Sequence, residues 1–150
     1  MCIDGNFTQK RLKSKYSDPG LIHPDTYFLP DIDVAAMEAL VDAARTGAPL
    51  SLMFKEFLPE EILDECERSF DAAQEKIAKA SGRFYGDTGL MALVCRHDRL
   101  LWIVNLTTPG ERQYYAFALI DRLFREIPDD WHVGLLYDIA CQLQRSMLKV

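Results

Sequence analysis

Two apolar runs on either side of a short polar segment constrain the fold of this chain most. The runs cover residues 89–95 and 100–106, and the segment Arg96–Arg99 separates them. Short apolar runs around a polar turn predict a β-hairpin. The patterns before and after this hairpin decide which class of fold contains it.

The segment after the hairpin predicts a helix, a strand and the beginning of a further helix. Thr108 and Glu111 have the spacing of a helix-capping box, with Pro109 at the first helical position. The helix that follows is expected to bury Ala116, Leu119, Ile120, Leu123 and Phe124. Residues 133–137 form a continuous apolar run, which is typical of a buried central strand. Residues 139–148 again have a helical pattern.

The segment before the hairpin is mostly helical in pattern. Residues 1–7 predict a short strand, which breaks at Asp4–Asn6. Residues 17–30 contain three prolines and are expected to form a loop. Residues 31–44 and 59–82 carry apolar side chains at spacings of three and four residues, so they predict two helices. The order of strand, helical insertion, hairpin, helix, strand and helix predicts a mixed α/β domain.

Composition excludes several classes of protein. With 150 residues, the chain has the length of about one domain. A hydrophobic fraction of 49% and a charged fraction of 27% exclude a disordered tail and a collagen-like fibre. No apolar run approaches the roughly 18 residues of a membrane-spanning helix, so we expect no membrane partner. Four widely separated cysteines without a secretory signal predict reduced thiols in a nuclear or cytosolic protein.

Charge is distributed unevenly along the chain. The net charge is −6, but residues 31–75 contain 12 acids and 3 bases and therefore account for −9. The rest of the chain is mildly basic, and Lys10, Arg11, Lys13 and Lys15 form a local basic run. That run is either a solvated loop or a surface that contacts phosphates. The acidic segment is poorly suited to DNA binding and could instead shield a site or contact a partner subunit.

Two aspartates are candidate metal ligands. Asp4 lies at the end of the first predicted strand, and Asp138 lies at the end of the predicted buried strand. If those strands are neighbours, both carboxylates meet at one edge of the sheet, where carboxylate oxygens can bind Mg²⁺ or Mn²⁺. Two such ions support phosphoryl transfer. The alternatives are a turn residue for Asp4 and a helix N-cap for Asp138.

Cys95, His97 and Cys141 form a second group of candidates. The first two lie at the hairpin turn, and Cys141 lies about one helical turn past Asp138. Cysteine and histidine suggest zinc, although three ligands at this spacing do not make a zinc signature. The alternative is a pair of partly buried thiols and a loop histidine. Arg112 either faces a phosphate or is a solvated helix residue.

Four ordered strings resemble those of the Kyakuja-Dileera-Zisupton (KDZ) transposases. They are DGNF at residues 4–7, GLMALVCRH at 89–97, PGERQY at 109–114 and LYDIACQ at 136–142. A fifth string, FLPDIDVAAM at 28–37, resembles the forms found in mushroom-forming fungi (basidiomycetes). Together the strings span almost the whole chain.

This resemblance implies an RNase H-like catalytic core with three acids, Asp-Asp-Glu. Such cores bind two divalent ions, Mg²⁺ or Mn²⁺, and cut and join DNA at transposon ends. By the resemblance, Asp4 matches the first acid and Asp138 the second. Cys95 and His97 match the family's Cys-x-His, and Cys141 matches a cysteine three places after the second acid. The resemblance also implies a nuclear location, otherwise a cytoplasmic one, and is compatible with a homo-oligomer.

The resemblance divides the chain into parts. Residues 1–8 are a remnant of the first strand, 17–82 are the acidic helical insertion, and 87–150 contain the hairpin, the helix, the second-acid strand and the start of the next helix. The family's third acid follows a further insertion and strand, and no residue here matches it. Because only Met1–Ile3 precede Asp4, we expect a shortened first strand and a partial core, from a decayed gene copy or a partial gene model.

Three functions stay open from the sequence. The first is a partial transposase core that does not cut or join DNA alone. The second is a non-enzymatic remnant that binds DNA through the basic run, or binds a full-length transposase. The third is an RNase H-like nuclease unrelated to transposition, which fits the two acids but not the acidic insertion or the matching strings.

Overall fold

The structure is a computed structural model that describes residues 1–16, 27–46, 61, 64–65, 68 and 84–147. The side chains of residues 144–147 are outside this description. Most of the predicted loop at 17–30 and of the predicted helix at 59–82 also lies outside the described residues.

Within the described residues, four strands form one mixed sheet in the order β5-β4-β1-β6. The predicted hairpin is confirmed as β4 (Gly89–Val94) and β5 (Leu100–Leu106), which pair antiparallel. Its turn closes where the Cys95 amide donates to the Arg99 carbonyl at 2.9 Å. Asp98, in this turn, adopts the left-handed backbone conformation, with a φ of 58°.

β1 (Cys2–Asn6) lies inside this sheet rather than at its edge. It runs antiparallel to β4 and parallel to β6 (Leu136–Tyr137), with Ile3 opposite Tyr137. Its five residues are an ordinary strand length, because pairing with β4 continues beyond Asp4 as far as Asn6. The expectation of a shortened first strand is therefore wrong. Asp4 lies within this strand rather than at its end.

β6 differs from the buried central strand that the apolar run at 133–137 predicted. It contains two residues at the edge of the sheet, and Leu136 is 71% exposed. The residues just before it lie against the core without pairing in the sheet; Val133 and Leu135 are partly buried there. An apolar run covers a core equally well as a strand or as an irregular segment, so the run alone did not fix the strand.

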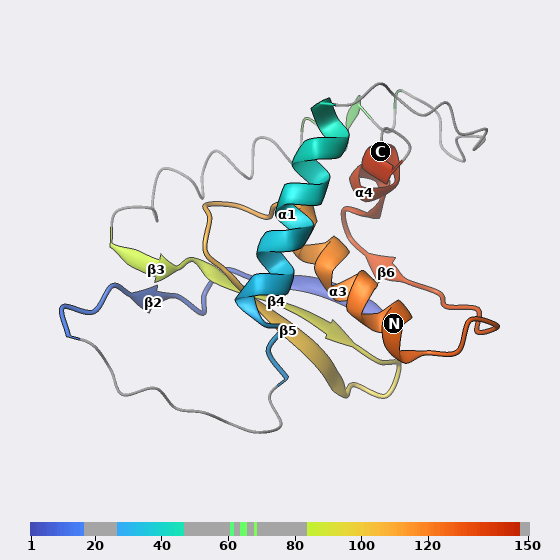
Figure 1. Cartoon of the computed structure of the whole chain (residues 1–150), viewed down its shortest axis with the longest axis horizontal. Helices are drawn as coiled ribbons and strands as arrows, with labels where there is room; N and C mark the ends of the chain where they lie inside the picture. Colours follow the sequence, from blue (N-terminus) through green and yellow to red (C-terminus); the bar gives the residue numbers. More distant parts are fainter. Residues whose placement is uncertain (17–26, 47–60, 62–63, 66–67, 69–83, 148–150) are drawn as a thin grey trace.

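Two helices, α1 (Asp31–Thr46) and α3 (Gln113–Glu126), lie on the same face of the sheet (Figure 1). The helix predicted from residue 31 is confirmed, with its acids in the first turn and Val41 buried. The capping box predicted for α3 is wrong, since the N-cap is Arg112 and it makes no side-chain capping bond. Thr108 instead donates its amide to the Tyr115 hydroxyl at 3.1 Å.

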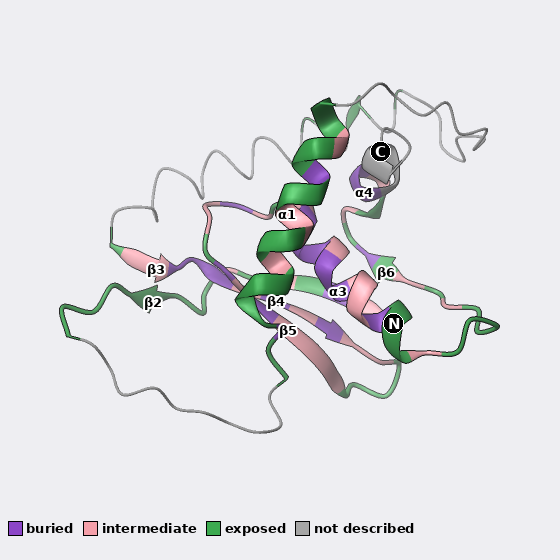
Figure 2. Cartoon of the chain, viewed as in Figure 1, coloured by how far each residue is buried: buried purple, intermediate pink, exposed green. Residues whose placement is uncertain are grey.

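The core lies between α3 and the sheet, where buried residues from both are concentrated (Figure 2). Its largest fully buried side chains are Ile3, Met91, Leu93, Val104, Leu106, Tyr115, Leu119 and Leu123. Two of the five residues predicted for the buried face of α3 are not fully buried: Ile120 is partly buried and Phe124 is 54% exposed. α3 begins at Gln113, which is later than a capping box with Thr108 as the N-cap would place its first residue.

Two further elements complete the description. β2 (Arg11–Leu12) pairs antiparallel with β3 (Tyr85–Asp87), which comes just before β4. The predicted last helix is confirmed as α4 (Ala140–Met147), whose Leu143 joins the core. Among the described residues, no helix is both long enough and apolar enough to cross a membrane.

Candidate metal and nucleic-acid site

The strand register brings the two predicted aspartates side by side. Ile3 and Tyr137 are the last pair between β1 and β6, and Asp4 and Asp138 are the next residue on each parallel chain. Neighbouring strands are about 4.8 Å apart, so the two backbones are adjacent at this position. Both aspartates are exposed. The register confirms that the two strands are neighbours, and a shared site for the two carboxylates stays a prediction.

Each aspartate carboxylate accepts a hydrogen bond from the amide next to it in the chain. Oδ1 of Asp4 accepts from Gly5, and Oδ1 of Asp138 accepts from Ile139, both at 2.8 Å. These are local bonds of the kind that turn and capping aspartates make. Such a bond at an exposed position contributes only about 1 kcal/mol. Each side chain can therefore turn toward a ligand at small cost.

A third carboxylate, Glu111, lies beside this pair. It precedes α3 and is partly buried, and the Tyr137 hydroxyl donates to its Oε1 at 2.6 Å. Burial raises the pKa of the Glu111 carboxyl, the Tyr137 hydrogen bond opposes that shift, and the charges of Asp138 and Asp4 raise the pKa further. The pKa of Tyr137 is also raised, first by its burial and then by Glu111. Negative charge therefore accumulates where β1, β6 and the start of α3 meet.

Sequence reasoning missed Glu111 and Tyr137 as members of this site. The sequence pattern places Glu111 in a capping box and Tyr137 in the apolar run of a strand. The signal that could have found them is the string PGERQY, which the resemblance already included at residues 109–114. Glu111 lies between Gly110 and the start of α3, and its carboxylate points toward the sheet, where it accepts from the Tyr137 hydroxyl.

The donor chemistry of this site suits a hard divalent cation. Asp4, Asp138 and Glu111 offer only carboxylate oxygens, which Mg²⁺ and Mn²⁺ prefer. In the part of the chain that the structure describes, no group of three or more His, Cys, Asp or Glu side chains is arranged to hold a metal ion. The three carboxylates therefore suit such an ion by donor type, whereas the arrangement of the described side chains does not form a complete site for it.

Cys95, His97 and Cys141 are not gathered at one point. The Cys95 sulfur lies 3.8 Å from Nδ1 of His97, and the His97 amide donates to it at 3.4 Å. Backbone hydrogen bonds from His97 and Arg99 lower the pKa of the Cys95 thiol. Cys95 directly follows Val94, which pairs with Cys2 at the beginning of β1. Cys141 comes after Asp138, which is level with Asp4, a later residue of β1. The cysteine–histidine pair and Cys141 therefore lie toward different ends of β1.

The basic candidates have different surroundings. Arg11 forms an ion pair with the buried Asp87, with Nε and Oδ2 2.5 Å apart, so it stabilises the β2–β3 pair. Nζ of Lys10 lies 5.3 Å from the centre of the Tyr85 ring. Lys13, Lys15 and Arg112 are exposed. Arg11 is thus less suited to a phosphate than the sequence suggested, while the exposed lysines stay candidates.

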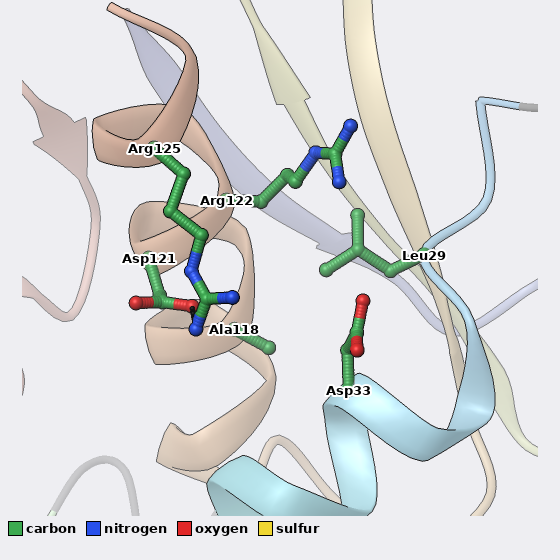
Figure 3. A pocket seen from close by; sticks show the side chains of 6 residues that line it. All are labelled: Leu29, Asp33, Ala118, Asp121, Arg122 and Arg125. Carbon is green, nitrogen blue, oxygen red and sulfur yellow. Dashed lines mark ion pairs between the residues drawn. The ribbon is translucent and has the colours of Figure 1, made fainter.

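A shallow pocket lies between α1 and the second half of α3 (Figure 3). Leu29 and Ala118 line it together with two aspartates and two arginines, Asp33, Asp121, Arg122 and Arg125. One pair is already joined, because Nη2 of Arg125 lies 2.7 Å from Oδ2 of Asp121. The two aspartates and two arginines of the pocket balance in charge, and the pocket lies far along α3 from Glu111. We therefore do not assign a ligand to it.

Comparison with models of protein families finds a match over the whole chain. The family profile described as KDZ, Kyakuja-Dileera-Zisupton transposase, matches residues 1–150. No curated protein and no solved structure matches the chain. The profile covers every residue, including Asp4 on β1, Asp138 directly after β6 and the loop that carries Glu111. The chain belongs to the KDZ transposase family.

Proposed function

We propose that this chain is part of the catalytic core of a KDZ transposase, which cuts and joins DNA with the help of divalent ions. The observation that carries the proposal is the position of β1 between antiparallel β4 and parallel β6, which makes Asp4 and Asp138 neighbours. Family membership supports a transposase-related function and DNA as the partner. The two aspartates are then the first two acids of the family's Asp-Asp-Glu set.

The proposal includes an RNase H-like fold for the core. Such a core needs its first strand in the middle of the sheet, with the second acid on a neighbouring strand. The order β5-β4-β1-β6, with α3 packed on one face, supports this assignment. In the same proposal, α1 belongs to the helical insertion between the first strand and the hairpin. The fungal character rests on FLPDIDVAAM at residues 28–37, and the nuclear location on the DNA substrate.

The chemistry divides between ion and protein. In the proposal, Asp4 and Asp138 would hold a pair of Mg²⁺ or Mn²⁺ ions where β1 and β6 lie side by side. Such ions would supply activation of the attacking oxygen and stabilisation of the leaving oxygen in phosphoryl transfer. No residue of the chain matches the family's third acid. Because losing one member of a catalytic set costs orders of magnitude in rate, we expect the 150-residue chain alone not to join DNA strands.

Iron-mediated cleavage of the polypeptide tests the metal site directly. Fe²⁺ with ascorbate and peroxide cuts a protein chain next to the place where the iron binds. We expect cuts near Asp4 and Asp138 that excess Mn²⁺ suppresses and that Asp138→Asn abolishes. Uniform cutting, or cutting unchanged by Asp138→Asn, would contradict the proposed site. Mn²⁺-dependent joining of DNA strands that is lost in Asp138→Ala would overturn the expected inactivity.

A further inference from the structure

We propose that the small β2–β3 ribbon binds single-stranded DNA, with its lysines on the phosphates and its aromatic rings on the bases. The ribbon is defined here as residues 10–16, which include β2, and residues 84–87, which include β3. This inference rests on the proposed function, which makes DNA the partner. It goes beyond that function because it names the form of the DNA and the residues that contact its bases.

The first support is the charge of the ribbon and the way in which it is held. Residues 8–16 contain four bases and no acid, in a chain whose net charge is −6. Nε and Nη2 of Arg11 donate to the two carboxylate oxygens of the buried Asp87 at 2.5 and 3.2 Å, which fixes β2 against β3. The exposed bases of the ribbon also include Lys10, Lys13 and Lys15. A surface of this kind complements a phosphate backbone.

The second support is the placement of aromatic rings beside these lysines. Nζ of Lys10 lies 5.3 Å from the centre of the Tyr85 ring. The Lys13 amide donates to the Phe84 carbonyl at 2.9 Å, so these two residues are neighbours across the ribbon. Phe84 is 64% exposed, and Tyr16 at the end of the ribbon is 83% exposed. Cationic and aromatic side chains therefore lie side by side on one small element.

This combination of side chains favours a single strand over a duplex. Lysines alone would bind both forms of DNA, because both carry phosphates. In a duplex, the faces of the bases are stacked within the helix, and a protein ring reaches them only after unstacking. In a single strand, successive bases can stack on aromatic side chains while the backbone follows a positively charged surface. The exposed rings therefore contribute to binding only where the bases are unpaired.

Fluorescence anisotropy with the full 150-residue chain tests this inference. The probes are a labelled single DNA strand of about 12 nucleotides and the duplex formed from the same strand. A chelator removes divalent ions, so that the proposed metal site does not contribute. Phe84→Leu and Tyr16→Leu remove the exposed rings and keep the charge, whereas Phe84→Tyr keeps a ring. The matched control is Phe124→Leu, at an exposed phenylalanine on α3. Circular dichroism checks folding, and Phe84→Met replaces a leucine variant that does not fold.

We expect each leucine variant of the ribbon to weaken single-strand binding about fivefold to tenfold, since stacking on an aromatic ring contributes at least this much per base. Duplex binding should stay within about twofold of the wild type, and the salt dependence of both should be unchanged, because the lysines remain. Phe84→Tyr and Phe124→Leu should bind both probes as the wild type does.

The other outcomes separate this inference from the proposed function. If the chain binds DNA but the ring variants keep wild-type affinity for the single strand, or lose affinity for both probes equally, the inference fails and the proposed function stands. An RNA strand of the same sequence that binds about tenfold tighter than the DNA strand would overturn the assignment to DNA. If the wild-type chain binds neither probe, the inference and the DNA partner fail together.

Discussion

At the residue scale, the hydroxyl of Tyr115 holds the loop before α3 in place. It is fully buried and accepts the amides of Thr107 and Thr108 at 3.0 and 3.1 Å. Tyr115→Phe should therefore lower the free energy of unfolding by about 1–3 kcal/mol, the cost of leaving such donors unsatisfied. Urea denaturation measures the change. Tyr16→Phe, at a site that is 83% exposed, is the control and should change nothing measurable. Equal stabilities for the two variants would show that water replaces the hydroxyl.

Also at this scale, Glu111 should make the stability of the metal-free protein depend on pH. Its folded-state pKa is raised above 4.5, chiefly by burial, so the folded protein keeps this proton to a higher pH than the unfolded chain does. The stabilisation is complete below pH 4.5 and is lost as the pH rises through the folded pKa. Glu111→Gln should remove this loss, so its advantage over the wild type grows from pH 4 to 8. An advantage independent of pH in urea denaturation with a chelator present would contradict this.

Individual residues differed in how far the sequence revealed them. Asp4 and Asp138 could be predicted as neighbours because each directly follows an apolar stretch, and the pairing of Ile3 with Tyr137 brings them level on adjacent chains. Glu111 could not, because its role depends on where a loop folds back onto β1. Tyr137 could not either, since the same apolar character suits a core residue and a residue that orients a carboxylate.

At the scale of elements, the close approach of the start of β4 to the end of β1 depends on Gly89. A side-chain carbon there would lie 2.6 Å from the Asn6 carbonyl oxygen and 3.1 Å from Cα of Phe7, both backbone atoms that cannot move aside. Gly89→Ala should therefore destabilise the protein by about 1–3 kcal/mol, as overpacking does. The matched control is Gly134→Ala, where no atom lies within 4 Å. Thermal melts of the two variants settle the comparison, and similar midpoints would mean that the strands separate to accept the methyl group.

The elements also show where pattern alone was sufficient. The hairpin and the last helix could be predicted because local spacing and turn residues fix them. The start of α3 could not, since Thr108 has the spacing of a cap but its amide is bound to Tyr115 in the tertiary structure. The strand at β6 could be predicted from its apolar run, but its short length and edge position could not, because they depend on pairing with Ile3, more than a hundred residues earlier in the chain.

At the scale of the whole molecule, charge sets how the chain can meet DNA. The net charge of −6 repels a polyanion, but residues 31–75 alone carry −9 and the rest of the chain carries +3. In the proposed function, DNA is expected to contact the basic run that follows β1, where Lys10, Lys13 and Lys15 are exposed. That run leads directly from the strand that carries Asp4. A phosphate backbone bound to these lysines would therefore lie near the strand that carries Asp4, and we expect the basic run to contribute to DNA binding.

Replacing these three lysines by glutamine should weaken duplex binding and flatten its salt dependence. Each lost phosphate contact reduces the slope of log affinity against log salt by about 0.9, so the triple variant should lose up to roughly 3 units of slope. Fluorescence anisotropy with random-sequence duplex DNA, between about 50 and 200 mM salt, measures both effects. Arg125→Gln, which removes one charge beside Asp121 on α3, is the control and should leave the slope unchanged. An unchanged slope in the triple variant would mean that this basic run is a solvated loop, and that DNA reaches the aspartates along another surface.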